Sequence, residues 1–468
     1  MVKCLRKSAY VPRKKTEDYE VGRRAKYSKF LRLSFAVMVS CCLGFLFFTS
    51  GFSLLWGEGN GTRRGYDSLC SSLSNGTLCC DRSNLRSDIC VMKGDVRTDS
   101  ISSSLLLYTD RNPTGIEKIR PYTRKWETHT MDTIDELNLI LKPSSGNSDH
   151  RCDVRHEVPA VFFSTGGYTG NLYHEFNDGI LPLYITSHHM NRRVVFAILE
   201  YHDWWFTKYG DVLRQLSEFP IIDFNRDRRV HCFPEATVGL KIHDELAIDP
   251  ALMENATKRT MVDFHDMLDR AYAPRISGFA KDEETDESSK RKPKLVIVSR
   301  KGSREITNEA SLVELAAEIG FTVEVLRPER TTELALIYWK LESSDVMVGV
   351  HGAAMTHFMF MRPKSVFIQV IPLGTRWPAE NYYGEPARKY GLKYVPYEIG
   401  AKESSLREKY DRNDPVLVDP ESVAGKGWEV TKKIYLDHQN VRLNLPRFRK
   451  RLVRAFEYCN RRRMTTKD

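Results

Sequence analysis

Residues 345–357 read DVMVGVHGAAMTH, in which an apolar run ends at Val350 and is followed at once by His351, Gly352 and Ala353. A short apolar run that stops at a glycine-containing turn is typical of a buried strand leading into a helix. In an open parallel sheet, ligands bind at the carboxyl ends of the strands. The next helix begins with unpaired N–H groups and a positive dipole end, which suit an anion. The stretch is therefore a candidate anion site; alternatively, His351 only caps the turn and Gly352 serves packing.

The segments around this stretch alternate between strand and helix. Strands are predicted at 294–299, 322–326, 345–350, 365–371 and 393–399, and helices at 308–320, 331–344 and 379–391, the second of them opening with a threonine cap. Alternation of this kind predicts a parallel sheet with right-handed crossovers, which is a Rossmann-like domain.

The preceding half repeats the pattern less regularly. Strands are predicted at 159–164, 194–199 and 220–224, and helices at 171–190 and near 206–218; KIRPYTRKWE (118–127) has the apolar spacing of a strand and TIDELNLIL (133–141) that of a helix. Residues 281–294, KDEETDESSKRKPK, carry both charge signs and little to bury, which indicates an interdomain linker. We therefore expect an α/β fold of two Rossmann-like domains that face a cleft, a common place for a ligand.

Composition excludes several classes of protein. The chain has 468 residues, of which 41% are hydrophobic and 28% charged, as in ordinary globular proteins. The net charge of +10 is concentrated in residues 1–34, with eleven Lys and Arg against three acidic residues. The remaining residues hold 60 basic and 58 acidic side chains, so the body lacks the basic excess that a nucleic-acid partner requires.

An uncharged apolar stretch follows the basic segment. Residues 35–56, FAVMVSCCLGFLFFTSGFSLLW, are long enough as a helix to cross a hydrocarbon core of roughly 30 Å. A cleaved signal peptide is the alternative, but its apolar region is usually shorter and its basic region much shorter. The positive-inside rule then places the C-terminal body on the lumenal side of the secretory pathway.

Cysteines and glycosylation signals agree with a lumenal body. Beyond the apolar stretch, Asn60, Asn75 and Asn255 each begin an acceptor sequon. The disulfide candidates are Cys70, Cys79, Cys80, Cys90, Cys152 and Cys232. With Cys459 the number of cysteines there is odd, so at least one thiol stays free or pairs with another chain. The predicted organisation is a cytosolic tail (1–34), an anchor (35–56), a stem (57–79), an N-terminal domain (80–280), a linker (281–294), a C-terminal domain (295–430) and a helical tail (431–468).

A second group of candidate residues follows the first strand of the C-terminal domain. Arg300, Lys301 and Arg304 would reach the same sheet edge as His351, where three cations would neutralise a diphosphate. The alternative is a solvated basic loop.

A third group lies in STGGYTGNLYHEFNDGILPLY (164–184), where a glycine-rich turn precedes a helix. His174 and Asp178 are four residues apart and share a helical face, and Glu175 is three residues from Asp178. These groups would present proton acceptors to the cleft opposite the cations; alternatively, they are structural groups that cap or bridge helices.

Several motifs are absent from the sequence. No two aspartates are separated by a single residue, so there is no D-x-D pair to hold Mn²⁺ or Mg²⁺. There is also no H-E-x-x-H, G-x-S-x-G or P-loop motif, so zinc protease, serine hydrolase and P-loop functions lack support.

The chain resembles plant members of glycosyltransferase family 61 from about Cys80 to its C-terminus. The matching stretches, in chain order, are CDRSNLRSDIC, GDVR, PYTRKWE, FSTGGYTGNLYHEFNDGILPLY, VSRKGSREITNE, VGVHGAAMTHFMFMRP, IQVIPLG, W-x-A-E-x-Y-Y-G (377–384), YEIGAKESSL and QNVRLNLPRFR. The resemblance implies a GT-B fold, an inverting mechanism, no essential metal and an anchor in the Golgi membrane. It also implies a UDP-pentose donor and a xylan acceptor, with arabinofuranose or xylose transferred.

The resemblance also implies roles for the candidate residues. An attacking hydroxyl needs a base, for which we expect Asp178, with His174 or Glu175 as rivals. The donor would be held by Arg300, Lys301, Arg304, His351, Gly352, Ala353, Glu380, Tyr382 or Tyr383, Glu403 and Ser404. Two alternatives stay open: a relative that acts on N-glycans or secreted glycoproteins, and a non-catalytic sugar-binding subunit that assembles with other glycosyltransferases.

Overall fold

The computed structural model describes residue 70 and residues 73–111, 115–144, 150–253, 258–279 and 292–465. The predicted anchor, most of the predicted linker and the sequons at Asn60 and Asn255 lie outside these residues, whereas Asn75 lies among them and is exposed. None of the helices formed by the described residues combines the length and the apolar character needed to traverse a bilayer.

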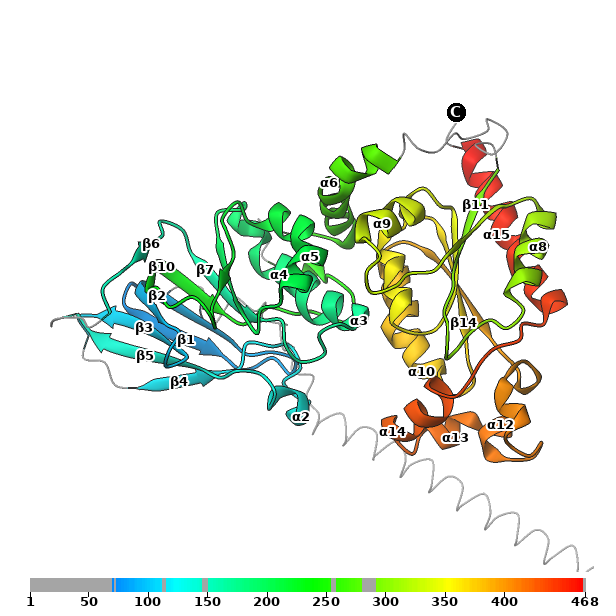
Figure 1. Cartoon of the computed structure of the whole chain (residues 1–468), viewed down its shortest axis with the longest axis horizontal. Helices are drawn as coiled ribbons and strands as arrows, with labels where there is room; N and C mark the ends of the chain where they lie inside the picture. Colours follow the sequence, from blue (N-terminus) through cyan, green and yellow to red (C-terminus); the bar gives the residue numbers. More distant parts are fainter. Residues whose placement is uncertain are drawn as a thin grey trace, which may run out of the picture. The chain divides into compact units, whose positions relative to one another are not determined.

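The C-terminal half is built on a five-stranded sheet in which all neighbours run parallel (Figure 1). Its strands are β11 (Lys294–Val298), β12 (Thr322–Leu326), β13 (Val346–Val350), β14 (Val366–Ile371) and β15 (Lys393–Glu398). Their spatial order is β12-β11-β13-β14-β15, so the winding reverses between β11 and β13. The five predicted strands and the Rossmann-like topology are confirmed.

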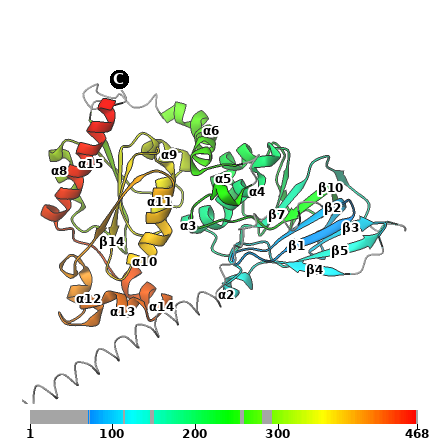
Figure 2. The ribbon, with the colours of Figure 1, turned by 180° about the vertical axis from the view of Figure 1, so that it is seen from behind.

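Helices cover both faces of this sheet. In the views of Figures 1 and 2, α8 (Glu309–Ile319) and α15 (Leu445–Thr465) lie on one face, and α9 (Leu334–Glu342) and α11 (Glu385–Lys389) lie on the other. The predicted threonine cap of α9 is wrong: the helix follows Glu333, whose side chain makes no capping bond.

The N-terminal half contains a ten-stranded mixed sheet. Its strands are β1 (Thr77–Asp81), β2 (Ile89–Asp99), β3 (Ser104–Thr109), β4 (Ile116–Ile119), β5 (Leu137–Pro143), β6 (Val154–Arg155), β7 (Ala160–Ser164), β8 (Val195–Leu199), β9 (Ile222–Asp223) and β10 (His231–Val238). Only β10, β7, β8 and β9 form a parallel, Rossmann-like run. Strand β2 pairs antiparallel with β1, β3 and β10, which extends the sheet beyond the predicted pattern.

The helix predicted over TIDELNLIL is wrong. Residues 137–143 form β5, which pairs parallel with β3 and antiparallel with β4. Leu137 and Leu139 are fully buried while Asn138 and Ile140 are half-buried, so the start of the stretch follows the two-residue period of a strand.

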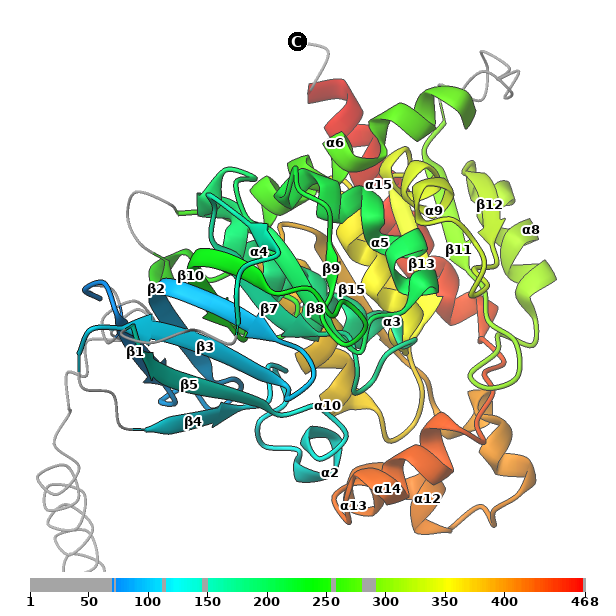
Figure 3. The ribbon, with the colours of Figure 1, turned by 60° about the vertical axis from the view of Figure 1, so that its left-hand side comes forward.

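The two halves share an apolar core around α6 (Met261–Phe279). This helix packs against α5 (Asp203–Leu216) of the N-terminal half and against α9 of the C-terminal half, and Figure 3 shows it above both. The buried rings of Tyr272 in α6 and Tyr338 in α9 lie 5.0 Å apart. The continuous core therefore joins the elements that carry the predicted site residues.

All six disulfide candidates are paired in the structure. The bridges are Cys70–Cys79, Cys80–Cys90 and Cys152–Cys232, while Cys459 is a buried free thiol. The third bridge joins residues 80 positions apart, so it constrains the unfolded chain more than the two local bridges do.

The predicted C-terminal helix, α15, is tied to the sheet by a buried carboxylate. Asp345, directly before β13, is 1% exposed; it accepts hydrogen bonds from Arg462 at 3.1 Å, from Arg463 at 2.6 Å and from the backbone N–H of Lys294 at 3.0 Å. A buried carboxylate needs such partners because its desolvation is costly.

We expect Asp345→Ala to lower the free energy of unfolding by about 2–3 kcal/mol, since it removes the charge-assisted hydrogen bonds that two partly exposed guanidinium groups donate to a buried carboxylate. Glu318→Ala is the matched control: it removes the exposed Arg449–Glu318 pair, which also joins α15 to the sheet domain, and should cost less than about 1 kcal/mol. Denaturant unfolding of both variants measures the difference, and equal losses would contradict the role of Asp345.

Candidate functional site

Two arginines converge on the turn after β13. Arg300 and Arg304 follow β11, the neighbouring strand at the reversal of winding, where the carboxyl ends of the strands meet. A Cβ atom at Gly352 would lie 2.3 Å from Arg300 Nη1 and 2.8 Å from Arg304 Nη1. Gly352 also has a φ of 145°, which favours glycine. The absence of a side chain at Gly352 thus allows both guanidinium groups to approach the backbone of this turn.

Within the part of the chain that the structure describes, the positive charge of this pair is not neutralised. Among the described residues, no carboxylate forms an ion pair with Arg300 or Arg304, and Asp437, the nearest acidic influence on Arg304, is engaged by Lys432. Burial lowers the pKa of Arg300, and burial followed by the charge of Arg300 lowers the pKa of Arg304 to about 10. Arg304 Nε is moreover a buried donor without a hydrogen-bond partner. An anion bound here would reduce the repulsion between Arg300 and Arg304, and it would accept a hydrogen bond from Arg304 Nε.

His351 contributes a neutral donor to the same turn. It is 3% exposed, and burial together with the charges of Arg304 and Arg300 lowers its pKa to about 3. Gln369 Nε2 donates to His351 Nδ1 at 3.0 Å, which assigns the ring proton to Nε2. The backbone carbonyl of His351 accepts a bond from Arg304 Nη1 at 3.1 Å, so the histidine also fixes that arginine.

The other predicted residues of this edge contribute less. Lys301 is exposed on the loop and is not drawn into the arginine pair. Ala353 begins a short 3₁₀ helix, Ala353–Phe360, whose first N–H groups follow Gly352. The helix predicted after this strand is therefore present, with the tighter 3₁₀ winding.

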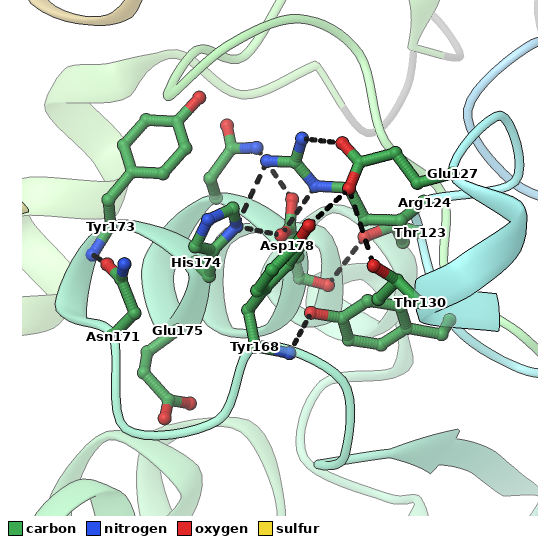
Figure 4. A network of polar contacts seen from close by, with 12 residues as sticks. Thr123, Arg124, Glu127, Thr130, Tyr168, Asn171, Tyr173, His174, Glu175 and Asp178 are labelled. Carbon is green, nitrogen blue, oxygen red and sulfur yellow. Dashed lines mark hydrogen bonds and ion pairs between the residues drawn. The ribbon is translucent and has the colours of Figure 1, made fainter. Parts of the chain in front are cut away.

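The N-terminal half contributes a buried acid–histidine pair on consecutive helical turns. Asn171 caps α3 (Leu172–His174) by accepting from the N–H of Tyr173, and a π-helical turn, Glu175–Ile180, follows. His174 Nδ1 lies 2.7 Å from Asp178 Oδ2 (Figure 4). Arg124 Nη2, a donor, lies 3.1 Å from the same nitrogen. The carboxylate contact is the shorter of the two, and a carboxylate only accepts, so we place the proton on Nδ1, which leaves His174 Nε2 as an acceptor.

Asp178 is held by more than its histidine. Arg124 Nε donates to Asp178 Oδ2 at 2.9 Å, and Asn177 Nδ2 donates to Oδ1 at 2.7 Å. Burial raises the pKa of Asp178, but the hydrogen bond from His174 and the charge of Arg124 outweigh it, so the pKa stays below its usual value. The Asp178 side chain is 1% exposed, whereas that of His174 is 16% exposed. Asp178 is thus a permanently charged partner that orients His174.

An aromatic and an acidic residue complete the network. The ring of Tyr168 stacks on His174 at 4.2 Å, and the Tyr168 hydroxyl donates to Glu127 Oε2 at 2.7 Å. Glu127 in turn accepts from Arg124 Nη1 at 2.8 Å. These contacts restrict the histidine to one orientation.

Glu175 faces a different environment. Its carboxylate accepts from the N–H of Gly170 at 2.6 Å and from Trp205 Nε1 at 2.5 Å, and it points away from Asp178 in Figure 4. Burial is the main reason that the pKa of Glu175 is raised. Glu175 therefore closes the glycine-rich loop onto α5.

Tyrosine side chains connect the two groups of site residues. The ring of Tyr173, next to His174, lies 5.9 Å from that of Tyr383, and Tyr383 lies 5.4 Å from His351. A cavity of about 570 Å³ is lined by residues 167–172 of the glycine-rich loop together with Ala353, Ala354 and His357. The loop of the predicted acid–base group and the turn of the predicted anion site are thus neighbours.

The remaining predicted residues have partners within the protein. Glu380 pairs with Arg388, and Tyr382 lies against Tyr173 with ring centroids 5.3 Å apart. Glu403 accepts from Tyr397 Oη at 2.6 Å and from the N–H of Asn444 at 2.7 Å. Ser404 Oγ donates to Gln439, whose backbone carbonyl accepts from the N–H of Arg304. Ser404 therefore holds the loop that carries Arg304 indirectly, through Gln439.

Sequence reasoning missed Arg124, Glu127, Gln369 and the stacking of Tyr168. Arg124 and Glu127 lie in a loop about 50 residues before His174, so no local spacing connects them to it. The only signal was that both belong to PYTRKWE, a stretch on which the family resemblance rested.

Comparison with known proteins identifies the family of the chain. The model of the family described as glycosyltransferase 61 matches residues 173–368, which include both groups of site residues. The chain is 53% identical over 96% of its length, and 95% of the relative's, to "Xylan glycosyltransferase MUCI21" of Arabidopsis thaliana. Two similar proteins of Oryza sativa subsp. japonica are 36% identical: "Beta-1,2-xylosyltransferase XYXT1" (84% of this chain, 87% of the relative) and "Alpha-1,3-arabinosyltransferase XAT3" (81% and 65%). The chain therefore belongs to glycosyltransferase family 61 and is a glycosyltransferase.

Proposed function

We propose that this glycosyltransferase moves a pentose, arabinofuranose or xylose, from a UDP-sugar onto xylan with inversion at the anomeric carbon. The observation that carries the proposal is the unneutralised pair Arg300 and Arg304 beside an oriented His174–Asp178 dyad, in a chain whose similar relatives are named for xylan, xylosyl or arabinosyl transfer. A GT-B arrangement is part of the proposal, supported by the two Rossmann-like sheets.

The arginine pair would stabilise the leaving diphosphate. Charge develops on the nucleotide as the glycosidic bond breaks, and fixed donors aimed at that charge lower the barrier. Arg300 and Arg304 supply charge, His351 Nε2 supplies a neutral N–H, and the turn at Gly352 supplies backbone donors. With these groups in place, no divalent ion is required by the proposal.

The dyad would activate the acceptor. His174 Nε2 takes the proton of the attacking hydroxyl, and Asp178 stabilises the imidazolium that forms. The sequence favoured Asp178 as the base, but its carboxylate is buried and engaged by three side chains. The geometry favours His174 for the proton transfer and Asp178 for positioning.

We also propose that residues 35–56 anchor the chain in the Golgi membrane with the body in the lumen. Three disulfides and the exposed sequon at Asn75 support an oxidising, glycosylating compartment. Removal of N-glycans from the plant protein by a glycosidase should increase its mobility on a gel, and an unchanged mobility would argue against lumenal placement.

Arg300→Ala and Arg304→Ala should each weaken UDP binding roughly ten- to hundredfold, because each removes a charge-assisted contact to phosphate. Lys433→Ala, which removes an exposed cation of the same half, is the matched control and should bind UDP as the wild type does. Titration calorimetry with UDP measures the affinities, and wild-type affinity in both arginine variants would remove the donor site from this edge.

His174→Ala should lower kcat at least about a hundredfold while UDP affinity stays unchanged, since the base contacts only the acceptor. Asp178→Asn should also lower kcat, because an amide no longer holds the Nδ1–H tautomer. Turnover of UDP-xylose or UDP-arabinofuranose with xylo-oligosaccharides provides the assay. A His174→Ala enzyme with normal kcat would exclude this histidine as the base.

Product should form at an undiminished rate in the presence of EDTA, because side chains rather than a divalent ion neutralise the diphosphate. The measurement compares initial rates with EDTA and with added Mn²⁺ on xylo-oligosaccharides and on glycopeptides. Loss of activity in EDTA that Mn²⁺ restores would contradict the metal-independent mechanism, and product only on glycopeptides would contradict the xylan acceptor.

A further inference from the structure

Aromatic side chains form a continuous series that leads outward from His174. Ring centroids lie 5.1 Å apart between His174 and Tyr173, 5.3 Å between Tyr173 and Tyr382, and 5.7 Å between Tyr382 and Trp377. Trp377, at the outer end, is 61% exposed. A large apolar ring held against other aromatics yet open to solvent indicates a surface for a ligand.

A buried guanidinium with unused donors lies beside this series. Arg86 pairs through Nη1 with Glu245 at 3.1 Å, and Glu245 also accepts from the Tyr173 hydroxyl. Arg86 Nε and Nη2 are buried without a hydrogen-bond partner, which is costly unless a ligand supplies an acceptor. Arg86 is connected to Tyr382 through Glu245 and Tyr173, because the Tyr173 ring lies 5.3 Å from that of Tyr382.

A second exposed tryptophan borders the same region. Trp126 is 47% exposed, and the guanidinium groups of Arg86 and Arg124 lie 5.2 Å and 5.1 Å from its ring. Arg124 is the residue that binds Asp178, so Trp126 is fixed close to the dyad. Exposed aromatic rings thus occur both on the loop that carries Arg124 and at the outer end of the series.

We propose that Trp377, Tyr382 and Arg86 form a subsite that holds the acceptor chain beyond the sugar being modified, and that Trp377 stacks on one of its pentopyranose rings. The proposal rests on the proposed function and identifies the acceptor side of that site. The C–H face of a neutral pyranose packs on the negative face of an indole ring. Its hydroxyl oxygens accept from Arg86 Nε and Nη2, which lack partners in the protein.

The direction of the series distinguishes acceptor from donor. The diphosphate is assigned to Arg300 and Arg304, and Tyr383 lies between that pair and Tyr173. The series starts at His174, the group that contacts the acceptor hydroxyl, and continues through Tyr382 to the surface. A ligand that follows it is therefore the chain that carries this hydroxyl.

Trp377→Ala tests the subsite through acceptor length. The KM for xylohexaose should rise about tenfold with kcat nearly unchanged, while the KM for xylobiose, too short to reach the outer ring, should stay the same. Trp377→Phe should restore most of the loss because it keeps an aromatic face. Trp428→Ala, which removes a tryptophan of similar exposure (49%) on the helical segment Trp428–Thr431, is the matched control and should leave both constants unchanged.

Arg86→Lys tests the unpaired donors separately. Lysine keeps the charge opposite Glu245 but offers no counterpart of Nε and Nη2, so the affinity for xylohexaose measured by calorimetry without donor should fall about tenfold. The unfolding midpoint of this variant checks that the ion pair is retained.

Wild-type affinity for xylohexaose in Trp377→Ala would overturn the subsite, as would a rise in the KM for the UDP-sugar with an unchanged KM for the acceptor. A wild-type enzyme that transfers no pentose to xylan would contradict the proposed function itself. An active wild type with an unaltered Trp377→Ala variant would contradict only the subsite.

Discussion

Two guanidinium groups placed side by side without a counter-ion are the constraint on which the site depends. Arg300 and Arg304 are drawn together where β11 and β13 end, and the charges of these half-buried side chains repel each other. The fold maintains this arrangement through Gly352, which leaves room for both. Arg304 also donates hydrogen bonds from Nη1 to the carbonyl of His351 and from its backbone N–H to the carbonyl of Gln439. Because the fold keeps the two like charges close together, an anion bound between them would be stabilised.

The opposite half of the site is organised by attraction. Asp178 is surrounded by donors, so its charge is stabilised and its position is fixed. The histidine that it holds keeps an open acceptor nitrogen beside the tyrosines that lead to His351. In the proposed mechanism one group would receive negative charge and the other would receive a proton, which are the two demands of an inverting transfer without a metal.

The C-terminal sheet could be predicted because each strand is a short apolar run bounded by turn residues, and the helices between them have their own period. The first part of the N-terminal half could not be predicted in the same way. Strand β2, ICVMKGDVRTD, mixes charged and apolar residues, and its partner β10 begins more than 130 residues later. The sequence shows that His174 and Asp178 are four residues apart, whereas the contact of Arg124 with Asp178 depends on the tertiary fold. Likewise, Glu175 is one residue from His174, but its carboxylate contacts Gly170 and Trp205 and does not join the dyad.

The core around α6 has a consequence for how the enzyme can be divided. Tyr272 and its apolar neighbours on this helix are covered partly by α9, although the helix precedes the charged segment at 281–294. A cut at that segment would separate α6 from α9 and expose an apolar face on each piece. Neither fragment would be expected to remain soluble alone, and the catalytic body is best produced and engineered as a single piece.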